Sequence, residues 1–146
     1  MVAGRGDRAK TTDGGPLMPG VGTEARATFP GLPESAGQAR RFVSGALAAA
    51  GRPEAADAAE VAVLLVSELV SNAVLHAGTE LEVVVRILPD RLVVEVHDQG
   101  GGRAVRRRYS RLSGTGRGLV LVEELARDWG TVVTEAGKYV WFELDL

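Results

Sequence analysis

Cysteine is absent from this sequence of 146 residues, and histidine occurs only twice, as His76 and His97. The lack of cysteine excludes disulfide bonds and thiolate metal sites. Two histidines so far apart in the chain are too few to build a zinc site from protein ligands alone. Each histidine is therefore expected to be a structural or partly exposed side chain.

A strong net charge is lacking too. The formal charge is −2 at pH 7, which argues against a general binder of nucleic acids or anionic membranes. The most apolar stretch is interrupted by Ser67, Glu68, Ser71 and Asn72, so we expect no segment to cross a bilayer. No apolar run resembling a secretion signal stands near the N-terminus. We therefore expect the protein in the cytoplasm.

The length of the chain and its hydrophobic content of 45% predict one domain with a substantial core. Residues 1–22 are rich in Gly, Arg, Asp, Thr and Pro and show no hydrophobic period. We expect them to form a disordered lead before a folded domain at residues 23–146. Met18 is a candidate for an alternative translation start.

Apolar periodicity and chain breakers predict helices over residues 34–50, 58–77 and about 119–129. Strands are expected over residues 25–29, 80–88, 91–97, 131–135 and 139–146. The first strand precedes a Pro-Gly-Leu-Pro turn and is expected at a sheet edge. This order predicts an α+β fold, a two-layer α/β sandwich with helices on one face of a mixed, largely antiparallel sheet.

Polar residues recur on one face of the long apolar helix. Glu68, Asn72 and His76 are spaced by four residues, so they stack along a single stripe. An acid and an amide oxygen among Val, Leu and Ala suit a hard cation and a proton acceptor.

Asp98 follows a buried strand and precedes three glycines. Asp before Gly is common in ordinary turns, which is one interpretation of this position. The other is a ligand site at a strand end, where the carboxylate accepts a hydrogen bond from an exocyclic amine such as that of adenine.

A second glycine-rich stretch, residues 114–118 with the sequence Gly-Thr-Gly-Arg-Gly, stands directly before a predicted helix. Converging amide hydrogens and the partial positive charge of a helix start suit a phosphate group. The Gly-Lys-Ser/Thr ending of a Walker loop is missing. A dinucleotide fingerprint is weakly supported, because no strand precedes the glycines, although Glu135 lies at a suitable distance downstream.

Arginines crowd the segment that runs from the first glycine stretch into the second. They indicate either a solvated loop, an anion-facing lid or a nucleic-acid binder, and the last is disfavoured by the near-neutral charge and the scarcity of aromatic residues. The arginines of this segment are Arg103, Arg106, Arg107, Arg108, Arg111 and Arg117.

As an ordered set, these motifs resemble the Bergerat-fold (GHKL) ATP-binding superfamily of gyrase, histidine kinases and heat-shock chaperones. Residues 68–72 resemble its N box, residues 98–100 its first glycine box and residues 114–119 its second. The phrases at residues 67–73, 97–98, 129–130 and 137–142 are most similar to the small bacterial anti-sigma-factor serine kinases. The resemblance covers residues 25–146.

The resemblance implies that Asn72 holds Mg2+ through its amide oxygen, and that Glu68 accepts the proton of an attacking serine hydroxyl or water. It implies that Asp98 recognises the adenine amine. Arg117 is our own candidate for countering charge during phosphoryl transfer. The remaining positions implied in binding ATP are Gly100, Gly102, Gly114, Thr115, Gly116, Gly118 and Leu119.

By the same resemblance the partners would be an anti-sigma-factor antagonist protein, a sigma factor or both, with ATP and Mg2+ as cofactors and a homodimer as the assembly. The chain departs from many relatives at Tyr139, where they carry a small hydroxyl residue near the adenine. Two alternatives stay open: a nucleotide-dependent binding module without phosphotransfer activity, and a detached histidine-kinase catalytic domain.

Overall fold

The computed structural model describes residues 2–4, 22–100 and 116–146. The strands in this part of the chain are β1 (Val2–Gly4), β2 (Thr23–Phe29), β3 (Leu81–Ile87), β4 (Arg91–Asp98), β5 (Asp128–Val133) and β6 (Lys138–Asp145). The helices are α2 (Ser35–Ala50), α3 (Ala56–His76) and α5 (Gly116–Leu125), with a short 3-10 turn η1 (Pro53–Ala55) before α3.

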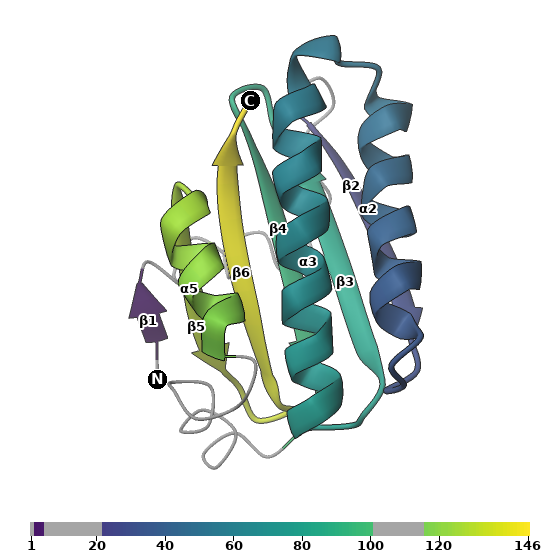
Figure 1. Cartoon of the computed structure of the whole chain (residues 1–146), viewed down its shortest axis with the longest axis vertical. Helices are drawn as coiled ribbons and strands as arrows, with labels where there is room; N and C mark the ends of the chain where they lie inside the picture. Colours follow the sequence, from purple (N-terminus) through teal and green to yellow (C-terminus); the bar gives the residue numbers. More distant parts are fainter. Residues whose placement is uncertain (1, 5–21, 101–115) are drawn as a thin grey trace.

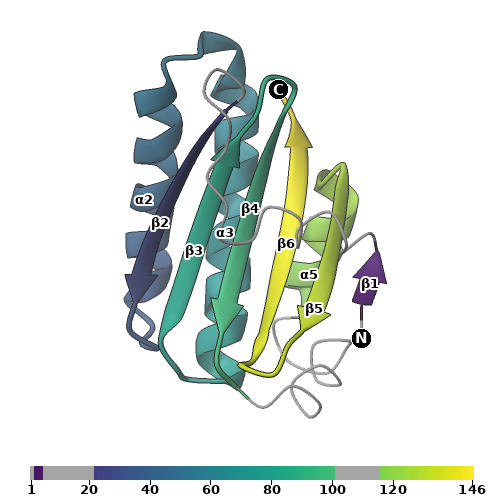
Figure 2. The same cartoon turned by 180° about the vertical axis from the view of Figure 1, so that it is seen from behind.

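The strands form one sheet in the order β1-β5-β6-β4-β3-β2, and α2, α3 and α5 cover one face of it (Figures 1 and 2). The predicted two-layer α/β sandwich is confirmed. All pairings among the described strands are antiparallel, so the sheet is more regular than the mixed one expected.

Strand alternation places the core between the two layers. Leu81, Val83 and Val85 of β3 face the helices, and all three are almost fully buried. Helix α2 ends as expected at Gly51, which adopts a left-handed conformation with φ of 66° that glycine tolerates without strain. The face of α2 that packs on the sheet buries Val43 and Leu47 in the same core.

Helix α3 corrects one expectation. The 24-residue stretch Pro53–His76, with a mean hydropathy of 1.7, is long and apolar enough to cross a membrane by length and composition. In the structure α3 lies between α2 and α5 and packs against the sheet (Figure 1). Its side chains Leu65 and Leu69 are buried there, whereas Leu64 and Leu75 are 41% and 60% exposed. Packing in the domain core therefore accounts for part of the hydropathy of α3, of whose apolar window 39% is buried.

The last helix is shorter than predicted. Helix α5 ends at Leu125, and Trp129 lies in β5, opposite Phe142 of β6. The backbone N–H of Arg127 donates to the carbonyl oxygen of Glu143, which begins the ladder with β6. Trp129 packs against the core from the sheet. The helix ends before Trp129 because this residue pairs with β6 instead.

Each of the two edge strands pairs with a strand that is distant in the sequence. Strand β1 forms within the segment expected to be disordered and pairs with β5. Residues 1 and 5–21 of that segment lie outside the described residues. Strand β2 pairs with β3 and, as expected, lies at an edge.

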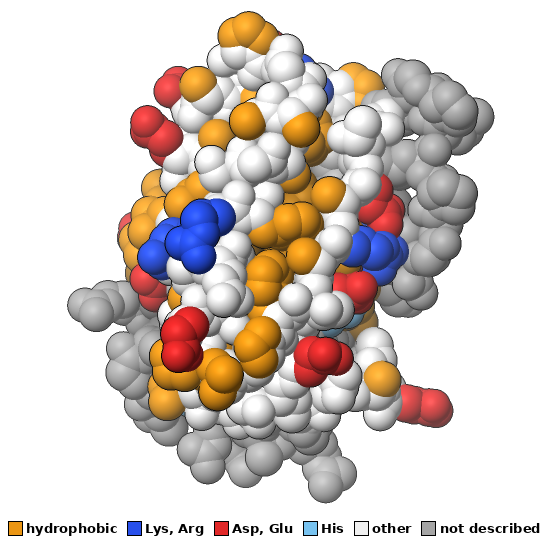
Figure 3. All heavy atoms as spheres, turned by 90° about the vertical axis from the view of Figure 1, so that its right-hand side faces the viewer, with side chains coloured by type: hydrophobic (Ala, Val, Ile, Leu, Met, Phe, Trp, Pro, Cys, Tyr) orange, Lys and Arg blue, Asp and Glu red, His pale blue; other side chains and the backbone are white. Residues whose placement is uncertain are grey.

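On the side formed by α2 and β2, hydrophobic side chains gather in a band with charged side chains to either side (Figure 3). Phe29 and Phe42 meet edge to face in this region, with 6.1 Å between ring centroids.

Candidate functional site

Three segments of the chain meet at one end of the molecule. Helix α3 ends there at His76, β4 ends there at Asp98, and α5 begins there at Gly116 (Figure 1). Helices α3 and α5 pack side by side. The structure therefore brings the sequence motifs of the helix, the strand end and the second glycine stretch to one place.

Asn72 is the most distinctive polar residue of this end. Its side chain is 1% exposed, and its Oδ1 atom has no hydrogen-bond partner among the described residues. Leaving a buried acceptor unpaired costs about 1–3 kcal/mol. An amide oxygen is a good ligand for Mg2+, so this unpaired oxygen fits a bound cation. Glu68, one helical turn earlier, is half-buried.

Asp98 lies on the helix-facing side of β4 and is buried together with Lys138 of β6. The two residues are directly opposite in the β4–β6 ladder. The Nζ atom of Lys138 donates to Oδ2 of Asp98 at 2.5 Å, and the backbone N–H of Gly100 donates to Oδ1 at 2.9 Å. A carboxylate has about four lone-pair positions, so the Asp98 carboxylate retains capacity to accept a bond from a ligand amine.

Lys138 was not predicted as a site residue. Burial lowers the pKa of its ammonium group, while the neighbouring Asp98 carboxylate opposes that lowering. The pair also borders a cavity of about 150 Å3, whose lining includes Thr28, Glu82 and His97 of the sheet face without helices, so this cavity is distinct from the meeting point of α3 and α5. Strand alternation between Lys138 and Val140, which faces the core, is the sequence signal that could have identified it.

Tyr139, by contrast, does not lie beside Asp98. It belongs to the sheet face without helices, where its ring stacks on His97 with 4.3 Å between centroids. His97 Nε2 lies 2.8 Å from Oε1 of Glu95, and Glu95 forms a buried ion pair with Arg86. The ring of Tyr139 therefore lies on the sheet face away from the carboxylate of Asp98, and the structural role expected for His97 agrees with these contacts.

The glycines of the motifs are described only in part. A Cβ atom on Gly100 would lie 2.7 Å from Cβ of Ala77, so glycine lets the strand end approach the end of α3. Gly102, Gly114 and Thr115 lie outside the described residues. The backbone of the first turn of α5 is described but its side chains are not, so the roles predicted for Arg117 and Leu119 stay predictions. Gly116 and Gly118 also belong to this turn, where free amide groups favour an anion.

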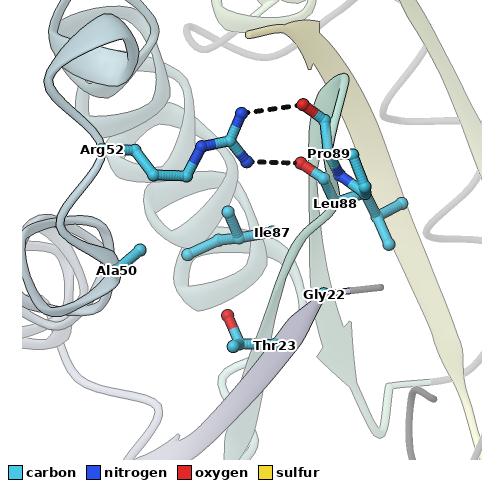
Figure 4. Close-up of a pocket in the computed structure, with 7 residues that line it drawn as sticks. All are labelled: Gly22, Thr23, Ala50, Arg52, Ile87, Leu88 and Pro89. Atoms are coloured by element: carbon cyan, nitrogen blue, oxygen red, sulfur yellow. Dashed lines mark hydrogen bonds between the residues drawn. The ribbon is translucent and has the colours of Figure 1, made fainter. Parts of the chain in front are cut away.

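A larger cavity lies at the opposite end of the molecule (Figure 4). It measures about 440 Å3 and is bordered by the turn between β3 and β4 and by the end of α2. Arg52 points at that turn and donates to the carbonyl oxygens of Leu88 and Pro89, at 2.7 Å each. Its Nε atom donates to Glu54 at 2.8 Å. The Arg52 guanidinium thus joins the β3–β4 turn to the connection between α2 and α3, which contains η1.

A comparison with protein families adds independent support. The model of the histidine kinase-like ATPase domain matches residues 29–144. The chain therefore belongs to the histidine kinase-like ATPase domain family, within the ATP-binding GHKL superfamily. Such domains bind ATP, usually with Mg2+. A comparison with curated proteins gives no match. The superfamily predicted from the sequence is confirmed, and the narrower resemblance to anti-sigma-factor kinases stays a prediction.

Proposed function

We propose that this protein is an ATP-binding regulator of the anti-sigma-factor type that acts in the cytoplasm. In this proposal it transfers phosphate to a serine or threonine of an anti-sigma-factor antagonist and thereby controls the release or capture of a sigma factor. One observation carries the proposal: the unpaired Oδ1 atom of buried Asn72 lies one turn after Glu68, on the helix whose end meets Asp98 and the start of α5.

The residues at this end divide the work of such a reaction. Bound Mg-ATP supplies the phosphoryl group. Asn72 holds the cation through its amide oxygen, and the carboxylate of Asp98 accepts a hydrogen bond from the base. The half-buried Glu68 accepts the proton of the attacking hydroxyl, and Arg117 counters negative charge on the phosphates. General-base catalysis of this kind contributes about 10²- to 10⁴-fold to a rate.

The experiment has two stages. Calorimetric titration of the full chain with Mg-ATP and Mg-ADP tests binding, and absence of heat at high protein concentration would defeat the proposal. Radiolabelled ATP is then supplied together with partner proteins that co-purify from the native cell and are identified by mass spectrometry. Label on a serine or threonine of the partner supports phosphotransfer. Binding without transfer would instead identify a nucleotide-dependent binding module.

A homodimer is part of the same proposal. Sedimentation of the purified chain, with and without Mg-ADP, measures the mass of the assembly directly. If the chain is a monomer of 15.3 kDa at all concentrations, the homodimer is excluded. The proposal of nucleotide binding is then unchanged.

A further inference from the structure

We propose that Lys138 is a positioning residue for base recognition: it keeps the Asp98 carboxylate ionised and oriented so that this carboxylate selects a base with an exocyclic amine. The inference rests on the proposed nucleotide site and deepens it. Lys138 does not touch the reacting phosphate in this account, and it acts through Asp98.

The geometry fixes both oxygens of the Asp98 carboxylate. Oδ2 is held by the Lys138 ammonium at 2.5 Å and Oδ1 by the Gly100 backbone N–H at 2.9 Å. The two donors come from different segments, β6 and the chain after β4. Because both oxygens are restrained, the orientation of the carboxylate is set before a ligand arrives, which reduces the ordering cost of binding.

The charge of Lys138 decides what kind of hydrogen-bonding group Asp98 is. The side chains of Asp98 and Lys138 are 1% and 0% exposed. A buried carboxylate without a cation tends to take up a proton, and a protonated carboxyl group carries a donor where the ionised form only accepts. Among the described residues, Lys138 is the cation that contacts Asp98. It therefore maintains the acceptor that an amine requires.

Stability alone is a poor explanation for this pair. Two charges removed from water cost more free energy than their attraction returns unless further bonds compensate. The position of the pair supports a role in recognition, because Asp98 lies at the end of β4 and is bonded by Gly100, whose backbone meets the end of α3 at Ala77. An adenine amine can donate to Asp98, whereas the 6-oxo group of hypoxanthine is an acceptor and faces an acceptor there.

The test is the ratio of affinities for Mg-ATP and Mg-inosine triphosphate, measured by calorimetry on the full chain. Wild type is expected to prefer ATP by about 10- to 100-fold, the range for one hydrogen bond to a charged group. Lys138→Met should reduce this ratio by about 10-fold or more. Lys138→Gln, which keeps a neutral donor, should reduce it too, and it serves if the Met variant does not fold. Arg127→Gln removes a charge from an exposed ion pair and should leave the ratio unchanged.

A double-mutant cycle separates positioning from a merely structural effect. In an Asp98→Asn background, Lys138→Met should no longer change the ratio, because its effect passes through the carboxylate. Equal loss of affinity for both nucleotides, or the same change of ratio in both backgrounds, would overturn the inference while leaving the proposed nucleotide site in place. If wild type binds neither nucleotide, the proposed function fails first and the role of Lys138 falls with it.

Discussion

The backbone of Gly137 passes so close to Asp98 that a Cβ atom on Gly137 would lie 2.1 Å from the Asp98 carbonyl oxygen. We expect Gly137→Ala to force β4 and β6 apart and to lower the free energy of unfolding by about 1–3 kcal/mol. Gly45→Ala is the control, because a Cβ atom there meets nothing within 4 Å in the middle of α2. It should stabilise the protein by about 0.5–1 kcal/mol. Urea unfolding of both variants measures the difference, and equal stabilities would contradict this packing.

Removing the unpaired oxygen of Asn72 should affect nucleotide affinity more than the stability of the fold. Asn72→Ala is expected to abolish the part of nucleotide affinity that depends on Mg2+, since the cation loses its amide ligand. The nucleotide-free variant should lose less stability than Leu69→Ala, a buried deletion on the same helix that should cost about 2–5 kcal/mol. Titrations with and without Mg2+ test the first point. Unchanged Mg2+ dependence would exclude Asn72 as the ligand.

The carboxylate of Glu68 can be neutralised with little change of shape. Glu68→Gln is expected to lower phosphotransfer to the partner by about 10²- to 10⁴-fold while nucleotide affinity stays within a few-fold of wild type. Glu60→Gln, an exposed change on the same helix, is the matched control and should behave as wild type. Transfer rates under single-turnover conditions provide the measurement. Loss of ATP binding in the Glu68 variant would argue against a role as the proton acceptor.

The pKa of Lys138 predicts how stability depends on pH. Burial lowers this pKa from 10.5, so the folded chain binds the proton more weakly than the unfolded chain. Between the two pKa values the unfolded state holds more protons, and the stability of the fold therefore rises as pH approaches 10.5. Lys138→Met lacks this contribution. Chemical unfolding across the alkaline range should show wild type gaining on the variant as pH rises, and a gap that narrows would reverse the assigned sign.

The sequence predicted those parts of the fold whose signals are local. The helical period and Gly51 defined α2, and alternating valines around a Pro-Asp turn defined the hairpin of β3 and β4. The end of α5 was missed because pairing of Trp129 with β6 is a long-range effect that outweighs helix propensity. The same holds for β1, whose three residues carry no pattern of their own.

Some residues of the candidate site could be predicted from the sequence, and others could not. Glu68 and Asn72 share a helix, so their spacing alone placed them one turn apart. The partner of Asp98 could not be obtained in that way, because Lys138 lies forty residues further along the chain and is brought near only by the register of β4 and β6. Tyr139, the departure from many relatives, has its ring on the opposite face of the same strand from Lys138.

The most direct test of the central claim maps where a nucleotide binds. Backbone amide shifts of the full chain are recorded by NMR during titration with Mg-ADP. The account predicts that amides of Asn72, Gly100 and Gly118, from three separate segments, shift together while those around Arg52 stay unchanged. Shifts confined to the Arg52 cavity, or no shifts at saturating Mg-ADP, would contradict a nucleotide site at the meeting point of α3, β4 and α5.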